Sequence, residues 1–254
     1  DYARSSVLAY TFSSTEAGVI SYGGACSGDR TVAAIGDNAV NFSVAAEGNY
    51  KNCTITVTDA LGNVSPALRV RAFTVDDSAP VLAEVVPVPG LANKPGPRYT
   101  FSSNEPGSVV YNGSCVSATT LVRSGIQTIK FNDLPDGSYQ ACSLVVTDRA
   151  GNIASLPVST FEVDTAAPVL LQEQEVTPAT ANPGQPPVYR FSTTEAGELV
   201  LGGGCTSADT AVLAGSNNIT FATVKTASYP GCTVSVRDNA GNLSVAIAAP
   251  FNVD

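Results

Sequence analysis

Carboxylate and amide side chains return at fixed positions along this chain of 254 residues. One turn-like segment is written three times, as VTDALGN at 57–63, VTDRAGN at 146–152 and VRDNAGN at 236–242, with spacings of 89 and then 90 residues. A glutamate recurs with nearly the same spacing, in YTFSSTEAG (10–18), YTFSSNEPG (99–107) and YRFSTTEAG (189–197). Carboxylate and amide oxygens are the ligands that a hard cation such as Ca²⁺ prefers. Cation binding is therefore the first chemistry to consider.

The cysteines predict a second kind of chemistry, the formation of disulfides. Two cysteines fall in each repeat, always 27 positions apart, and no CxxC motif or histidine accompanies them as a metal site would require. Both members of each pair are expected on the core-facing side of their strands, so an inter-sheet bridge within each repeat is predicted, which implies an oxidising compartment. In the loop-entropy model each bridge contributes about 3–4 kcal/mol. The predicted pairs are Cys26–Cys53, Cys115–Cys142 and Cys205–Cys232.

Composition argues against several function classes. The chain contains no His, Met or Trp, so the usual general base is missing, no nucleophile motif has a recognisable setting, and we expect no enzyme activity. With 13 basic against 22 acidic residues it has no basic face for nucleic acid. No run of 18 apolar residues is present, so no membrane span is expected. The absence of Met predicts a processed chain or a fragment.

Strands must position these residues. Alternating apolar residues occur in CTITVTD (53–59), in the segments before the first cysteine of each pair and around Phe42, Phe131 and Phe221. Short strands separated by turns rich in Gly, Asn, Asp and Pro predict an all-β chain of three tandem immunoglobulin-like β-sandwiches with one disulfide each. The predicted domains are 1–76, 77–164 and 165–254.

The D-x-x-G-N run, the closing F-x-V-D and the following x-A-P linker resemble the bacterial immunoglobulin-like repeats of large surface adhesins and other extracellular stalk proteins. The resemblance covers nearly the whole chain. It implies an extracellular or cell-surface location, and calcium-stiffened junctions such as those of adhesin stalks and cadherin-like arrays. The cysteine pair departs from most such repeats, which lack disulfides.

The topology of such a sandwich brings three segments to one end of a domain: the incoming linker, the glutamate loop and the D-x-x-G-N loop. Calcium is the expected cofactor there. The first repeat has a matching set in which only Asp1 could replace the linker. The predicted metal ligands are Asp76, Asp77, Glu105, Asp148 and Asn152 at the first linker, Asp164, Glu195, Asp238 and Asn242 at the second, and Glu16, Asp59 and Asn63 in the first repeat.

Two interpretations of these polar positions stay open beside cation binding. Asp, Gly and Asn are also common in turns, because Asp caps a turn through its side chain and the other two tolerate positive φ, so turn chemistry alone could explain D-x-x-G-N. Tyr50, Tyr139 and Tyr229 could stack on a sugar, but a packing role near the tyrosine corner of such sandwiches is favoured.

The first repeat is predicted to lack its first strand. From Asp77 to Phe101 there are 24 positions, but from Asp1 to Phe12 only 11, and SSVLAYTF (5–12) reads as the second strand. An open edge could recruit a strand from another chain, and residues 1–9 could themselves be placed in a neighbouring domain. The alternative is a sandwich that closes without this strand, or a chain cut there.

Three functions follow as hypotheses. The first is a non-enzymatic extracellular stalk or adhesin segment, and the second is a subunit of a cell-surface filament assembled by strand complementation. The third, less favoured, is a carbohydrate-binding module. The expected partners are neighbouring immunoglobulin-like domains, other copies of the chain or a surface ligand.

Overall fold

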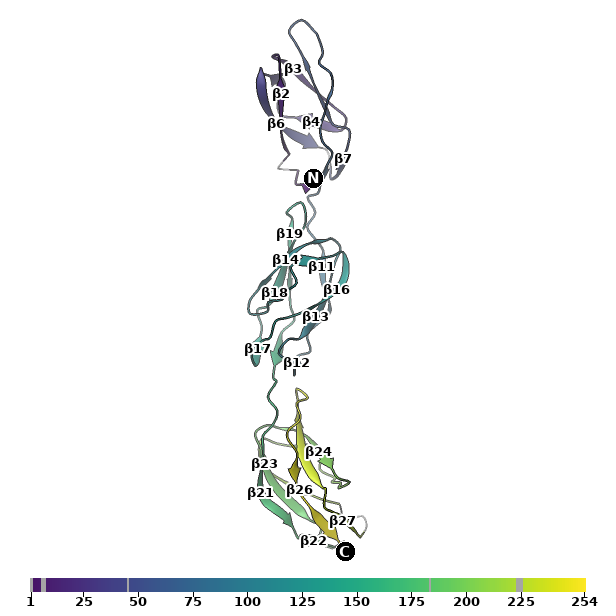
Figure 1. The fold of residues 1–254 in the computed structure, drawn as a ribbon, viewed down its shortest axis with the longest axis vertical. Coiled ribbons are helices and arrows are strands. Elements are labelled where there is room, and N and C mark those ends of the chain that lie inside the picture. Colours follow the sequence, from purple (N-terminus) through teal and green to yellow (C-terminus); the bar gives the residue numbers. More distant parts are fainter. Residues whose placement is uncertain (1, 6–7, 45, 183, 223–225) are drawn as a thin grey trace. The chain divides into compact units, whose positions relative to one another are not determined.

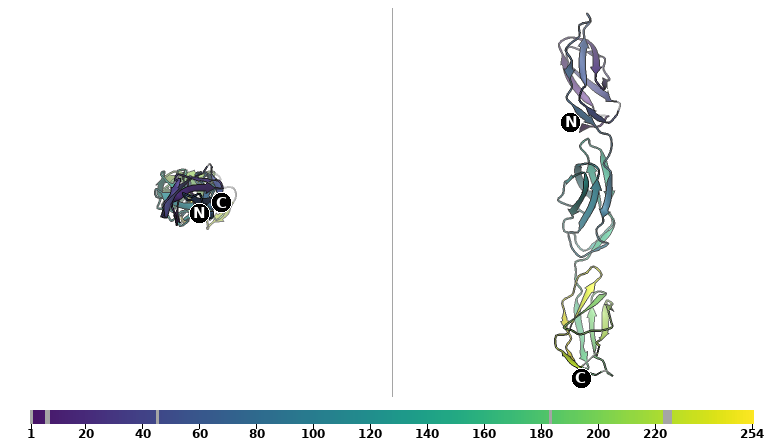
Figure 2. Two further views of the ribbon diagram at one scale, coloured as in Figure 1. Left: turned by 90° about the horizontal axis from the view of Figure 1, so that it is seen from above. Right: turned by 90° about the vertical axis from the view of Figure 1, so that its right-hand side faces the viewer.

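The computed structural model describes residues 2–5, 8–44, 46–182, 184–222 and 226–254. These residues form strands and connecting loops only, in three tandem immunoglobulin-like β-sandwich repeats, as predicted from the sequence (Figures 1 and 2). No helix in this part of the chain has the length and apolar character that crossing a membrane requires.

In the first repeat the strands are β1 (Tyr2–Ala3), β2 (Ala9–Ser14), β3 (Gly18–Gly23), β4 (Cys26–Gly28), β5 (Val32–Ala33), β6 (Gly36–Val44), β7 (Gly48–Tyr50), β8 (Thr54–Thr58), β9 (Leu68–Arg69) and β10 (Phe73–Val75). They form sheets of order β2-β6-β4, β5-β3-β8-β9 and β1-β10-β7. Aromatic and branched side chains on the inner faces form the core, with Phe12, Ile20, Val40, Phe42 and Ile55 at its centre.

In the second repeat the strands are β11 (Leu82–Val86), β12 (Leu91–Ala92), β13 (Arg98–Ser103), β14 (Gly107–Asn112), β15 (Leu121–Val122), β16 (Gly125–Lys130), β17 (Gly137–Tyr139), β18 (Ser143–Thr147), β19 (Ile153–Pro157) and β20 (Phe161–Val163). Their sheet orders are β11-β13-β16, β15-β14-β18-β19 and β12-β20-β17.

In the third repeat the strands are β21 (Leu170–Thr177), β22 (Thr180–Ala181), β23 (Val188–Thr193), β24 (Gly197–Gly202), β25 (Ala211–Val212), β26 (Gly215–Thr220), β27 (Ala227–Tyr229), β28 (Thr233–Asp238), β29 (Ile247–Ala248) and β30 (Phe251–Val253). The sheets repeat the pattern of the second repeat, with orders β21-β23-β26, β25-β24-β28-β29 and β22-β30-β27. Tyr189, Phe191 and Phe221 are fully buried in its core.

By its contacts the chain divides into two compact units. One comprises residues 1–87, 99–129 and 142–158, and the other comprises 88–98, 130–141 and 159–254, so the second repeat contributes to both. Asp76, Glu105 and Asp148 lie together in the first unit, and Asp164, Glu195 and Asp238 lie together in the second. The domain boundaries after residues 76 and 164 stay a prediction, and each falls between strands, after β10 and after β20.

The three disulfides join the predicted pairs, with Cα–Cα distances of 5.5, 5.5 and 5.6 Å. All six cysteines are buried. In the first repeat the bridge connects the two sheets, as predicted, because Cys26 lies in β4 beside β6 and Cys53 directly precedes β8 of the other sheet. The strand before the first cysteine does not continue to it, since β3 and β8 are neighbours in one sheet. Gly24, at a φ of 76°, turns the chain out of β3, and Cys26 then pairs with β6 of the other sheet. The bridge therefore ties the start of β8 to the segment that crosses between the sheets.

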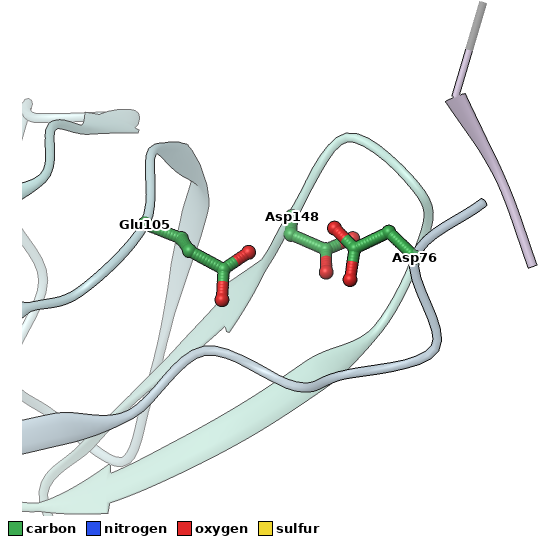
Figure 3. A group of neighbouring side chains, drawn as sticks. All are labelled: Asp76, Glu105 and Asp148. Atoms are coloured by element: carbon green, nitrogen blue, oxygen red, sulfur yellow. The ribbon is translucent and has the colours of Figure 1, made fainter. Parts of the chain in front are cut away.

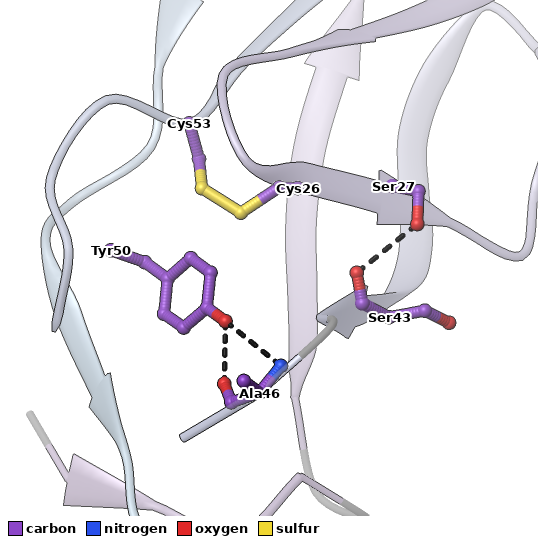
Figure 4. The surroundings of a disulfide bond; sticks show 6 residues. All are labelled: Cys26, Ser27, Ser43, Ala46, Tyr50 and Cys53. Carbon is purple, nitrogen blue, oxygen red and sulfur yellow. Dashed lines mark hydrogen bonds between the residues drawn. A yellow bond between two sulfur atoms is a disulfide. The ribbon is translucent and has the colours of Figure 1, made fainter. Parts of the chain in front are cut away.

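The tyrosine before the second cysteine packs inside the protein, as the favoured interpretation holds. The Tyr50 hydroxyl donates a hydrogen bond to the backbone carbonyl of Ala46, beside the disulfide (Figure 4). Tyr139 donates in the same way to the carbonyl of Pro135, at 2.7 Å. Tyr50 stacks on Phe73 with ring centroids 5.3 Å apart, so its ring face is engaged internally.

Candidate functional site: two acidic groups at the linkers

Three carboxylates from distant parts of the sequence meet at the first linker. Asp76 follows β10, Glu105 lies in the loop between β13 and β14, and Asp148 follows β18. One carboxylate oxygen of each lies within 4.8 Å of the other two. Figure 3 shows the three side chains pointing toward one another. The convergence of linker, glutamate loop and D-x-x-G-N loop that the sequence predicted is thus present here.

The second linker repeats this arrangement in the other unit. Asp164 follows β20, Glu195 lies between β23 and β24, and Asp238 ends β28. Their carboxylate oxygens also lie within 4.8 Å of one another. Two independent copies of one geometry argue that the repeat sequence specifies it.

The aspartate of each group is fixed by its own turn. Asp148 Oδ1 accepts hydrogen bonds from the backbone N–H groups of Gly151 and Asn152, at 2.7 and 2.8 Å, and Oδ2 accepts one from Asn152 Nδ2 at 2.9 Å. Gly151 has a φ of 91°, which favours glycine at this position. A carboxylate has about four lone-pair sites, so Asp148 Oδ2, which accepts one hydrogen bond here, keeps capacity for a cation. The turn and cation interpretations are therefore compatible.

The asparagine of this turn also holds the linker. Asn152 Nδ2 donates a hydrogen bond of 2.9 Å to the backbone carbonyl of Asp76, and Asn242 Nδ2 donates one of 2.8 Å to that of Asp164. The predicted asparagines therefore act through their amide N–H groups on the linker backbone. In this arrangement they position the acidic group around them.

Burial and the neighbouring negative charges disfavour the ionised form of each glutamate. The pKa of Glu105 is raised, first by burial and then by the charges of Asp76 and Asp148. The pKa of Glu195 is raised by burial and by Asp164 and Asp238. Both glutamates are half-buried. A bound cation would reverse this penalty, since opposite charge favours the ionised carboxylate.

Asp77 does not join the group, and its prediction as a ligand beside Asp76 is wrong. Its Oδ1 accepts a hydrogen bond of 2.8 Å from the backbone N–H of Ser5 in the first repeat. The cause is the extended linker, in which neighbouring side chains point to opposite sides. Asp76 therefore lies with the loops of the second repeat, while Asp77 is exposed.

Two acidic residues that were not singled out from the sequence accept hydrogen bonds from the linkers. Glu47 Oε1 accepts from the backbone N–H of Asp77 at 2.7 Å. Asp136 Oδ1 accepts from the backbone N–H and the hydroxyl of Thr165, at 3.0 and 2.8 Å. A signal was present in the sequence, since both acids precede a Gly-x-Tyr segment at the same repeat position.

The matching residues of the first repeat are more open. Glu16, Asp59 and Asn63 line one shallow pocket, and Asp59 keeps the same turn, with Oδ2 accepting from Asn63 Nδ2 at 2.8 Å. Glu16 and Asn63 are exposed, and neither acid belongs to a group of three among the described residues. Asp1, which could have taken the linker's place, lies outside the described residues.

Each linker group could hold one divalent cation. Three carboxylates supply charge and at least three oxygens, and calcium takes six to eight oxygen ligands, so water or further carboxylate oxygens would complete the shell. Asp76, Glu105 and Asp148 would be the ligands at the first linker, and Asp164, Glu195 and Asp238 at the second.

No protein-family model matches the chain, and no curated protein matches it. Among solved structures it is similar to the fibronectin(III)-like modules of Clostridium thermocellum CbhA, with 12% identity and a TM-score of 0.37 over 68% of this chain and 94% of that one. It is also similar to SGBP-B of the Bacteroides ovatus mixed-linkage glucan utilization locus, solved with a mixed-linkage heptasaccharide, with 13% identity and a TM-score of 0.20 over 84% of this chain and 55% of that one. The chain thus spans about half the length of SGBP-B.

Proposed function

We propose that residues 1–254 are a non-enzymatic structural or adhesive repeat segment that works outside the cell, as part of a stalk or adhesin. The observation that carries this proposal is the repeated linker geometry. Both linkers are hydrogen-bonded to the following repeat by an asparagine amide, beside an acidic group of the same design. Three buried disulfides support an oxidising setting.

In this function a divalent cation, most simply calcium, stiffens each linker. Without a cation the three carboxylates repel one another, and the pKa of Glu105 is raised by burial and by the charges of Asp76 and Asp148. With a cation the linker carboxylate is tied to two loops of the following repeat. Because Asp76 and Asp164 belong to the linkers themselves, cation binding would restrict linker motion more than it would alter either sandwich.

Two measurements test the extracellular role and the cation binding separately. Antibodies against residues 1–254 should label intact cells that produce the protein; labelling only after permeabilisation would contradict the extracellular role. Small-angle X-ray scattering and thermal melting are compared in millimolar calcium and in chelator. Calcium should raise the melting temperature by mass action and narrow the distribution of interdomain distances. Identical scattering and melting curves in calcium and in chelator would mean that the loops act only as turns and bind no cation.

A second candidate is a filament subunit that takes a strand from another molecule. Purified chain that forms long assemblies would support the filament, whereas a monomer at all concentrations would support the stalk.

A further inference from the structure

One asparagine of the second repeat departs from the repeat pattern. The segments that lead to the first cysteine read YGGAC (22–26), YNGSC (111–115) and LGGGC (201–205). Asn112 thus stands where the sister repeats carry Gly23 and Gly202. It is also the single asparagine of the chain that is followed by glycine. Because the sister repeats fold with glycine here, the asparagine is not required by the shared fold.

An asparagine before glycine can react with its own backbone. The peptide nitrogen of the glycine attacks the side-chain carbon Cγ, and glycine has no side chain to obstruct this approach. The new N–Cγ bond forms as the Cγ–Nδ2 bond breaks, and the proton of the peptide nitrogen leaves with the amide group as ammonia. Water then opens the five-membered succinimide ring at either carbonyl, which gives aspartate or isoaspartate. The two steps consume one water, release one ammonia and change no oxidation state.

The side chain of Asn112 is accessible and weakly held. Asn112 is the last residue of β14, and it is exposed together with Gly113 and Ser114. Its Nδ2 donates one long hydrogen bond, of 3.5 Å, to Ser143 Oγ. By contrast, Nδ2 of Asn152 makes two bonds of 2.9 Å. Little therefore keeps the Asn112 amide from turning toward the attacking nitrogen.

The attacking nitrogen lies outside the sheet ladder. The last pair between β14 and β18 joins Asn112 and Ser143, and β15 on the other side of β14 pairs only with Gly107 and Ser108. Gly113 follows both ladders, at a φ of 76°. Among the described residues its N–H donates to no backbone carbonyl. No ladder hydrogen bond therefore has to break before the attack.

The one Asp-Gly pair of the chain could form the same ring, but the structure restrains it. Asp136 Oδ1 accepts hydrogen bonds from the backbone N–H and the hydroxyl of Thr165, at 3.0 and 2.8 Å. Gly137 belongs to β17 and is paired with Val163. An ionised carboxylate is also a poorer electrophile than an amide. The fold thus favours reaction at Asn112 over Asp136.

We propose that Asn112 is a deamidation site, converted without an enzyme to aspartate and isoaspartate over the life of the protein. The site goes beyond the stalk role and does not depend on cation binding. Isoaspartate adds one methylene to the main chain at the turn that leads to Cys115. This turn is tight, since a Cβ on the counterpart Gly24 would collide with the carbonyl of Asn52. Conversion therefore adds a negative charge and loosens the end of β14 beside the bridge.

The test incubates folded chain 1–254, with its disulfides intact, at neutral and at mildly alkaline pH. Peptide mass spectrometry with electron-transfer fragmentation then measures aspartate and isoaspartate at each position. We expect both products at Asn112, formed at least about tenfold faster than at any other asparagine because glycine alone leaves the attack unobstructed. The rate should rise with pH, since the attacking nitrogen must lose its proton.

Two controls separate the reaction from damage to the fold. Asn112→Gly carries the residue of the sister repeats, so it should keep the three bridges and show no conversion at this position. In the reduced, urea-unfolded chain the restraints on Asp136 are gone, so isoaspartate should appear there as well. In the folded chain Asp136 should stay unchanged while Asn112 converts.

Three outcomes would overturn the proposal. One is an unchanged Asn112 in the folded chain under conditions that convert a synthetic peptide VVYNGSCVS, that of residues 109–117. Another is faster conversion at a different asparagine or at Asp136 in the folded chain. The third is a glycan on Asn112 in protein from its natural source, because Asn112, Gly113 and Ser114 also form an N-glycosylation sequon and a glycosylated amide is no longer free to react.

Discussion

Asn152 holds Asp76 across 76 positions of sequence, through a 2.9 Å hydrogen bond from its side-chain amide to the backbone carbonyl of the aspartate. The same amide nitrogen donates to Asp148 Oδ2 at 2.9 Å. One residue thereby fixes both the linker and the turn beside it. The third repeat contains the same relationship between Asn242 and Asp164. In the first repeat the described part of the same turn keeps the Asn63 Nδ2 hydrogen bond to Asp59 Oδ2, at 2.8 Å.

Asn152→Ala should loosen the first linker. The change leaves the Asp76 carbonyl and one Asp148 oxygen without their partner in a buried setting, at a cost of about 1–3 kcal/mol. Hydrogen exchange resolved by repeat should show faster exchange around residues 76–78 and 148–152. The matched control is Asn63→Ala, which removes a bond to Asp59 at an exposed turn and should cost less than about 1 kcal/mol. Equal effects at the two sites would argue that the linker bond adds nothing.

Replacing the two clustered glutamates should raise stability without calcium and reduce the stabilisation that calcium gives. The variant Glu105→Gln/Glu195→Gln removes like charge, so in chelator its melting temperature should rise, by an amount that solvent screening limits to about 1 kcal/mol per site. In calcium the same variant loses a ligand at each linker, so the stabilisation by calcium should shrink. Differential scanning calorimetry in both buffers checks this.

The control for that variant is Glu16→Gln. Glu16 occupies the same repeat position but is exposed and belongs to no group of three acids among the described residues. It should alter neither the melting temperature in chelator nor the calcium effect. A calcium response that persists undiminished in Glu105→Gln/Glu195→Gln would place the cation elsewhere.

The raised pKa values predict a pH dependence with a definite sign. A carboxyl group with a raised pKa in the folded state binds its proton more tightly there, so protonation favours folding. In chelator, the contribution of Glu105 and Glu195 to stability should therefore decrease as the pH rises through the ordinary value of 4.5 and above. Once both are ionised in the folded state, the loss is complete.

The difference between wild type and Glu105→Gln/Glu195→Gln isolates this contribution. Other acids act oppositely, since hydrogen bonds from Asn63 lower the pKa of Asp59 and its stabilising effect is lost at low pH. Denaturant melts of both proteins in chelator, from about pH 4 to about pH 8, should show wild type losing stability relative to the variant. A constant difference would contradict the coupling among the three carboxylates.

The repeat pattern predicted the acidic groups because it placed whole loops rather than single side chains. Asp148 and Glu105 belong to segments written three times, and immunoglobulin-like topology brings those segments together. The sequence could not predict which of Asp76 and Asp77 joins the acidic group. In an extended linker alternate side chains point to opposite sides, and only the structure shows which side faces the loops. The bracing role of Glu47 also needs three-dimensional placement, because its partner Asp77 is 30 positions away.

The sequence predicted the pairing of the cysteines and a bridge between the sheets, but it did not predict that β3 ends before Cys26. Equal spacing of 27 gives the pairing, while the crossing of the chain after β3 depends on Gly24 and its positive φ. A glycine in an alternating strand is compatible with either a continued strand or a turn. The structure resolves this by pairing Cys26 with Val44 of the opposite sheet.

Removing the second disulfide, by Cys115→Ala/Cys142→Ala, should destabilise the second repeat by about 3–4 kcal/mol. The bridge closes a loop of 27 positions, and loop-closure entropy of the unfolded chain sets this magnitude. Both cysteines are buried, so alanine leaves small cavities but no unpaired polar group. Repeat-resolved hydrogen exchange should show faster opening of β14 and β18, which are paired up to Asn112 and Ser143 beside the bridge. Peptide mapping without reduction is the companion measurement: in wild type it should give only the three bridges within repeats. A peptide that joins cysteines of different repeats would refute the pairing.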